Sequence, residues 1–89
     1  MPTVLTHFKV KDFAAWRNAF ANNEPMRSAA GITNVRVLHS VDDPGDVFIQ
    51  GDTSNLAKAK EFAKSPELKT IMEKTGVVTS AEWYFLDTE

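Results

Sequence analysis

The hydrophobic period changes several times along the chain, and the order of these changes leaves few possible folds. Apolar residues alternate with a period of two over residues 3–10, 32–41, 47–51 and 77–86. After the first and third of these stretches they recur at helical spacing. A period of two is typical of a half-buried strand, and an i, i+3, i+7 recurrence is typical of an amphipathic helix. The sequence therefore predicts an α+β fold in the order β-α-β-β-α-β, a ferredoxin-like arrangement with a four-stranded antiparallel sheet and helices on one face.

Capping and helix-breaking residues set the expected ends of the first helix. Asp12 stands where an N-cap is expected, and Trp16 and Phe20 then lie on one helix face. Pro25 has no N–H to donate, so we expect the helix to end or kink before it and to restart as a short turn. Gly31 is expected to close that turn as a C′ residue.

The second helical stretch is expected to contain an internal restart. Residues 52–54 are the candidates for its N-cap. Ser65 followed by Pro66 has the pattern of a new N-cap with proline in the first turn, and Gly76 is the expected helix end.

The hairpin between the second and third strands is expected to turn at residues 43–46. Pro44 presets φ and Gly45 accepts a positive φ, which together favour a type II turn. The strand before the turn is expected to run to Val41, with His39 and Val41 on the same face.

Large apolar residues on both faces of the last strand predict that the second face of the sheet is also covered. Trp83 and Phe85 lie on one face of this strand, whereas Tyr84 and Leu86 lie on the other. Leu5 adds to the second face from the first strand. A monomer would expose an apolar patch on the order of several hundred square ångströms, more than soluble monomers usually tolerate. The sequence therefore predicts a homodimer that packs sheet to sheet.

The composition is that of one globular domain, residues 1–89. Ten Lys and Arg residues stand against 12 Asp and Glu, so the basic excess that nucleic-acid binding needs is missing. Cysteine is absent, which excludes disulfides, thiolate nucleophiles and Cys-ligated zinc. No apolar run approaches the roughly 20 residues of a membrane span, and no leader pattern opens the chain. We expect a cytoplasmic protein that contacts neither nucleic acid nor membrane.

Two residues are candidates for catalysis. His39 shares a strand face with apolar neighbours, where an imidazole could act as a general base; the alternative is a histidine whose nitrogens are satisfied at the strand end. Tyr84 could donate its hydroxyl to a substrate carbonyl or simply to solvent. His7 and His39 would lie two strand spacings apart, about 9.6 Å, so no metal is predicted. No nucleotide-binding or dinucleotide-binding motif is present, and no cofactor is expected.

Six large side chains are candidates for an apolar ligand pocket between the helices and the sheet. They could line a flat cavity, but residues at this helical spacing are more often part of an ordinary hydrophobic core. Arg27 could pair with an acidic ligand or form a surface salt bridge. The candidate pocket residues are Phe8, Trp16, Phe20, Phe62, Met72 and Trp83.

Several segments spread over nearly the whole chain form a recognisable pattern: Val10-Lys11-Asp12-Phe13 with Trp16 and Phe20, Arg27 to Gly31, Asp42-Asp43-Pro44, Phe62 with Ser65, Leu68 and Met72, Gly76-Val77, and Tyr84-Phe85-Leu86. Through them the chain resembles the dimeric α+β barrel superfamily, and more narrowly the small bacterial proteins of the antibiotic biosynthesis monooxygenase and "cyclase" type. The resemblance implies two ferredoxin-like subunits joined through their sheets. It also implies a small-molecule-binding protein, either a cofactor-free monooxygenase or cyclase acting on an apolar or aromatic compound, or a non-catalytic ligand-binding or stress-related scaffold dimer.

Overall fold

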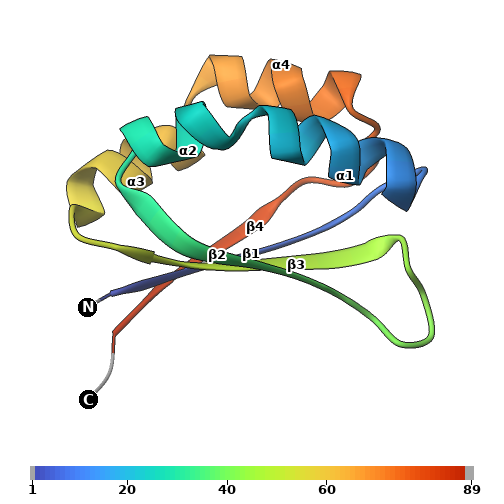
Figure 1. Cartoon of the computed structure of the whole chain (residues 1–89), viewed down its shortest axis with the longest axis horizontal. Helices are drawn as coiled ribbons and strands as arrows, with labels where there is room; N and C mark the ends of the chain where they lie inside the picture. The colour runs from blue at the N-terminus through green and yellow to red at the C-terminus, as the bar shows by residue number, and fades with distance from the viewer. Residues whose placement is uncertain (1, 88–89) are drawn as a thin grey trace.

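A four-stranded antiparallel sheet carries all of the helices on one side, as Figure 1 shows for the computed structural model, which describes residues 2–87. The strand order is β2-β3-β1-β4, so the first strand of the chain lies in the middle of the sheet. This arrangement confirms the predicted fold class. The elements are β1 (Thr3–Lys9), α1 (Phe13–Asn22), α2 (Glu24–Ala29), β2 (Ile32–His39), β3 (Asp46–Thr53), α3 (Leu56–Ala63), α4 (Pro66–Lys74) and β4 (Glu82–Leu86).

Proline divides each of the two crossovers into two helices. Pro25 lies in the first turn of α2, and Pro66 lies in the first turn of α4. Backbone N–H groups in a first turn have no acceptor within the helix, so the N–H that proline lacks costs no helical hydrogen bond there. The Asp12 side chain caps α1 by accepting from the Ala15 N–H, and the Ser65 side chain caps α4 by accepting from the Leu68 N–H. These breaks and caps confirm the predictions.

The N-cap of α3 differs from the prediction. Residues 52–54 were the expected candidates, but the side chain of Asn55 accepts the Lys58 N–H. The reason is that β3 continues through Thr53, which is fully buried. The Thr53 hydroxyl accepts the Asn55 N–H at 3.1 Å and so positions the cap rather than providing it.

Two strands are shorter than the hydrophobic alternation predicts. The stretch 77–86 becomes strand only at β4, because the positive φ of Gly76 (92°) redirects the chain and leaves Val77 with one isolated bridge to Val10. The second strand ends at His39 rather than at Val41. Val41 is 97% exposed in the hairpin turn, so its expected place on the strand face is wrong.

The hairpin turn is not of type II. The Asp46 N–H donates to the Asp43 carbonyl at 3.0 Å, but Gly45 is not among the glycines with positive φ, which are Gly31 and Gly76. Glycine is needed at position 45 for space, because a Cβ there would lie 2.9 Å from the Val10 carbonyl oxygen. The turn therefore packs tightly against the end of β1.

A bulge in β2 shapes the helix-facing side of the sheet. Asn34 has a φ of 52°, and the pairing with β3 shifts register between Thr33 and Arg36. Ile32 and Val35, which lie three positions apart, consequently both face the helices.

The buried core lies between the sheet and the helix layer in two clusters. The helix-facing residues of β1 are all buried, which confirms the predicted face, and the opposite face carries no helix (Figure 1). One cluster contains Val4, Ala30, Ile32 and Ala59, and the other contains Phe8, Val10, Trp16 and Val47.

Gly51 in β3 faces a part of the core with no room for a side chain. A Cβ there would lie 2.9 Å from Ile32 Cγ2 and 3.4 Å from Val35 Cγ2. We expect Gly51→Ala to lower the free energy of unfolding by about 1–3 kcal/mol through overpacking. Urea unfolding monitored by tryptophan fluorescence measures this change. Ser54→Ala, at an exposed position next to β3, should stay within about 0.5 kcal/mol of wild type; equal midpoints for both variants would contradict the prediction.

Candidate functional site

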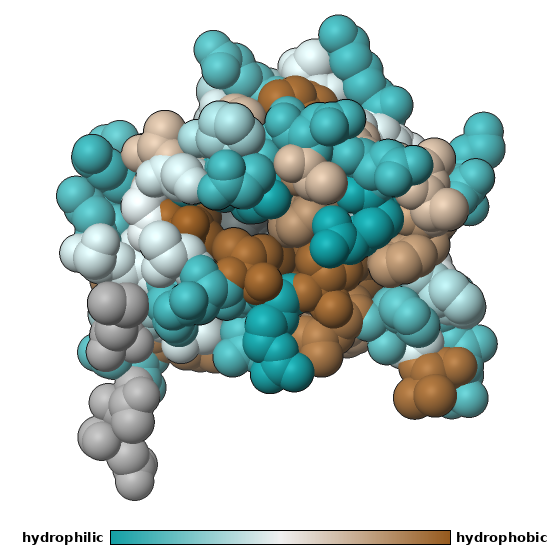
Figure 2. Space-filling model, viewed as in Figure 1, coloured by the Kyte–Doolittle hydropathy of each residue, from teal (hydrophilic) through white to brown (hydrophobic). Residues whose placement is uncertain are grey.

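An apolar cavity of about 80 Å³ lies between the helix layer and the sheet. Its walls come from every strand and every helix of the fold, with the bulged strand β2 and Gly51 at the sheet side. Figure 2 shows apolar side chains gathered in the middle of the molecule, between the helices and the sheet. The lining residues are Val4, Thr6, Phe8, Trp16, Phe20, Asn23, Met26, Arg27, Ile32, Val35, Ile49, Gly51, Phe62, Leu68, Ile71, Met72, Thr75 and Trp83.

All six residues that the sequence suggested for a pocket line this cavity. Trp16 is central to the aromatic part of the wall: its ring stacks with Phe20 at a centroid distance of 5.0 Å and meets Phe8 edge-on at 5.5 Å. Phe62 meets Trp83 edge-on at 6.3 Å. The rings therefore form flat walls of the kind that suit a planar apolar molecule. Whether they bind one stays a prediction.

Three uncharged polar side chains also line the cavity, and each donates to a backbone carbonyl. The Thr6 hydroxyl donates to the Glu82 carbonyl at 2.8 Å, and the Thr75 hydroxyl donates to the Ile71 carbonyl at 2.9 Å. The Asn23 amide donates to the Ala19 carbonyl at 3.0 Å. The hydroxyl hydrogens are thus engaged within the protein, which leaves the cavity wall apolar in character.

Arg27 is the only ionisable residue of the lining given above. It reaches the cavity from α2, and its Nη1 donates to the Phe20 carbonyl at 2.6 Å. Its Cζ lies 3.7 Å from the centre of the Phe20 ring, which is a cation–π arrangement. Within residues 2–87 no carboxylate forms an ion pair with Arg27, so the surface salt bridge considered from the sequence is not formed. Burial lowers the pKa of the guanidinium.

The structure separates the two candidate catalytic residues from the cavity. His39 is exposed at the end of β2, where its ring meets Phe13 edge-on at 5.1 Å and its Nδ1 lies 2.9 Å from the Ser40 carbonyl oxygen. Tyr84 lies on the opposite face of the sheet, where its hydroxyl donates to Glu82 at 2.5 Å. Neither residue lines the cavity. The geometry therefore does not bring these two residues together with the pocket, and their catalytic roles stay predictions.

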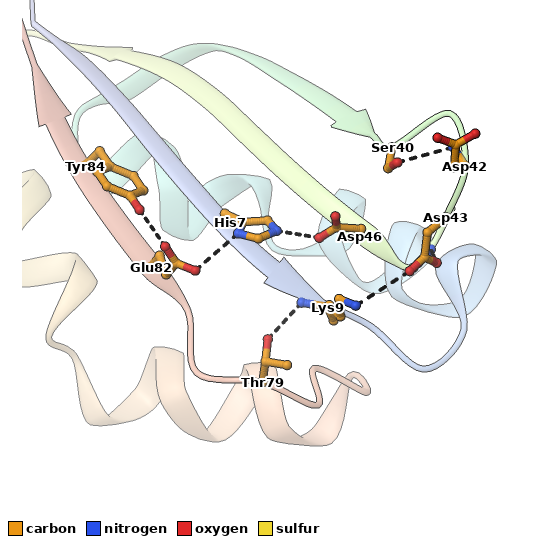
Figure 3. Close-up of polar contacts among 10 residues, drawn as sticks. His7, Lys9, Ser40, Asp42, Asp43, Asp46, Thr79, Glu82 and Tyr84 are labelled. Carbon is orange, nitrogen blue, oxygen red and sulfur yellow. Dashed lines mark hydrogen bonds and ion pairs between the residues drawn. The ribbon is translucent and has the colours of Figure 1, made fainter.

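Sequence reasoning missed a polar cluster on the face of the sheet that carries no helix. Figure 3 shows His7 between two carboxylates: its Nε2 contacts Asp46, and its Nδ1 lies 3.4 Å from Glu82 Oε1. The imidazole also stacks on Phe48 at a centroid distance of 4.3 Å. The register places Phe48 and Glu82 directly opposite His7 on the two neighbouring strands. Only the pairing of β3 and β4 with β1 brings these residues together, so no local motif signals the cluster.

The electrostatics of this cluster favour a protonated imidazole. The hydrogen bond with Asp46 raises the pKa of His7 above its usual 6.5, more than partial burial lowers it, and Glu82 adds in the same direction. A carboxylate accepts but cannot donate, so only the imidazolium can donate to both neighbours. Hydrogen bonds from Tyr84 and then from His7 hold the pKa of Glu82 below its usual value, and Glu82 raises the pKa of Tyr84.

No group of three or more His, Cys, Asp or Glu side chains among residues 2–87 is arranged to hold a metal ion. None of the helices described here combines the length and the apolar character that crossing a membrane requires.

The chain has the fold of solved structures described as antibiotic biosynthesis monooxygenases. One such structure is similar with a TM-score of 0.75 and 11% identity, over 100% of this chain and 99% of that chain. SnoaB, a cofactor-independent oxygenase from Streptomyces nogalater, is similar with a TM-score of 0.75 and 12% identity, over 99% and 92% of the two chains. A conserved protein from Methanosarcina mazei gives 0.74 and 12%, over 99% and 92%. No protein-family model and no curated protein sequence matches the chain.

The pH dependence of stability should report the His7 cluster. Because the folded state raises the pKa of His7, its protonation stabilises the fold fully below pH 6.5, and this contribution is lost as the pH rises through the raised pKa. We expect the free energy of unfolding to decline over this range in wild type and to decline less in His7→Gln. Urea unfolding in a pH series at fixed protein concentration measures both slopes. His39→Gln, which removes the exposed histidine outside the cluster, should keep the wild-type slope; a flat wild-type profile would contradict the assignment.

Proposed function

We propose that this protein binds a small, flat, apolar compound in the cavity between its sheet and its helices. The observation that carries the proposal is the cavity itself, which has aromatic walls and one ionisable residue in its lining. Ligand pockets are typically apolar with a few polar groups that fix orientation, and this lining has that composition.

The space between the side chains supports a binding role over a plain core. Side chains that line such a space lack the dispersion contacts that a close-packed core provides. A flat apolar compound in the cavity of about 80 Å³ would supply those contacts.

Cofactor-free oxygenation of the bound compound is the second candidate function. It is favoured by the fold shared with SnoaB, which is described as a cofactor-independent oxygenase. The lining given above holds no histidine, carboxylate or tyrosine that could remove a proton from a bound substrate. Binding is therefore the function that the site itself supports. Turnover is tested separately, by measuring whether purified wild type and His39→Ala form a product that depends on oxygen.

We also propose that two copies associate through the sheet face opposite the helices. Apolar side chains on this face are exposed although they stand in regular strands: Leu38 is 38% exposed, Tyr84 is 44% exposed and Leu86 is 48% exposed. Phe48 adds an aromatic ring beside the His7 cluster. An exposed apolar face of this kind is typical of a protein interface.

Blocking the cavity should abolish ligand binding. Leu68 lines the cavity from α4, so Leu68→Trp is expected to fill it and to weaken binding of acetophenone, a neutral flat aromatic ketone, by about ten-fold or more. Isothermal titration calorimetry measures the affinity, and native mass spectrometry of freshly purified protein tests for a retained compound. The matched control is Leu56→Trp, at a position of α3 outside the lining, which should keep wild-type affinity. Equal affinity for the two variants would place the ligand elsewhere.

A charge in the open sheet face should dissociate the dimer. Leu86→Lys would bury an unpaired ammonium group in the proposed interface, and we expect it to weaken association by about ten-fold or more. Sedimentation velocity over a concentration series measures the subunit count. Val41→Lys, in the exposed hairpin turn, is the control and should sediment as wild type does. A wild-type protein that is monomeric at every concentration would refute the dimer.

A further inference from the structure

Arg27 is positioned by two contacts but is not fully satisfied by the protein. Nη1 donates to the Phe20 carbonyl, and the Phe20 ring lies under the guanidinium plane. Nε is buried and has no hydrogen-bond partner, and it is the single atom of this kind among the described side chains. A buried donor without a partner costs free energy, so its presence at a cavity wall calls for an acceptor that a ligand could provide.

The charge of Arg27 is likewise left without a close counter-charge. The described residues place no carboxylate in an ion pair with it. Burial lowers its pKa; Glu24 on the same helix opposes this at longer range, and Arg17 on α1 adds to the lowering. A partly desolvated guanidinium without a close counter-charge favours an anion beside it.

Hydrogen bonding within the protein leaves one donor of the guanidinium unpaired. Nη1 donates to the Phe20 carbonyl, whereas the buried Nε has no partner. In any guanidinium, Nε and Nη2 together form a fork that matches the two oxygens of a carboxylate. The rest of the lining is predominantly apolar and offers no second cation, which suits a single negative charge on an apolar body.

We infer that the ligand of the cavity is a flat apolar acid, whose carboxylate is bound by Nε and Nη2 of Arg27 while its ring lies among the aromatic walls. This inference rests on the proposed function, because it assigns a chemical class to the compound held in the same cavity. Arg27 then selects the ligand by its charge, and the aromatic residues select it by its shape.

The test compares benzoate with benzamide, which have the same ring and the same number of heavy atoms but differ in charge. Calorimetry on wild type should show benzoate binding about ten-fold more tightly than benzamide, the difference between a charge-assisted and a neutral hydrogen bond. Arg27→Gln should bring the two affinities together by weakening benzoate alone. Arg17→Gln is the matched control: it removes an exposed guanidinium 5.6 Å from the same Phe20 ring and should preserve the ten-fold preference.

A spectroscopic readout on the unmodified protein keeps the test independent of how well the variants fold. The Nε–H resonance of Arg27, assigned by nitrogen-15 NMR, should shift on addition of benzoate and move little with benzamide. Equal affinities for the two compounds, or an unmoved Nε–H resonance at saturating benzoate, would overturn the inference. If acetophenone, benzoate and benzamide all fail to bind, the proposed function fails with it; if all three bind alike, only the acid is refuted.

Discussion

The structure depends on the antiparallel pairing of β1 with β3 in the middle of the sheet. On one face this pairing aligns Phe8 with Val47 and Thr6 with Ile49, and these side chains form the floor on which the helices pack. On the other face the same register brings His7 next to Phe48. Because side chains alternate along a strand, one set of backbone hydrogen bonds positions both the cavity wall and the polar cluster.

The cavity lies where large aromatic rings face a part of the sheet that contains Gly51. Trp16 and the other rings are rigid and cannot close every gap in a domain with one helix layer. On the sheet side, Gly51 and the bulge at Asn34 bring Ile32 and Val35 into the wall without filling the space in front of it. The result is a flat apolar site whose single charge, at Arg27, lies next to the Phe20 ring.

The two faces of the sheet differ in chemical character. The face under the helices is apolar and partly enclosed, and it is the face proposed to bind a ligand. The opposite face mixes exposed apolar side chains with the His7 cluster, and it is the face proposed to bind a second subunit. Tyr84 belongs to the second face because it neighbours Trp83 along β4, where successive side chains point to opposite sides. Its pairing with Glu82 makes it part of the cluster rather than of the pocket.

The sequence predicted the element order and the helix breaks at Pro25 and Pro66, because hydrophobic period and proline chemistry act locally. The sequence also offered six side chains for a pocket; they lie among the residues that line the cavity, and their role in binding stays a prediction. It misplaced the N-cap of α3, the turn type at Gly45 and the ends of two strands, which depend on how distant backbone segments approach one another. The contacts of His7 with Asp46 and Glu82, and the lack of a partner for Nε of Arg27, follow from the packed structure alone. The His7 contacts join residues far apart in the chain and depend on the strand register. The burial of Nε arises only when the helices have packed on the sheet.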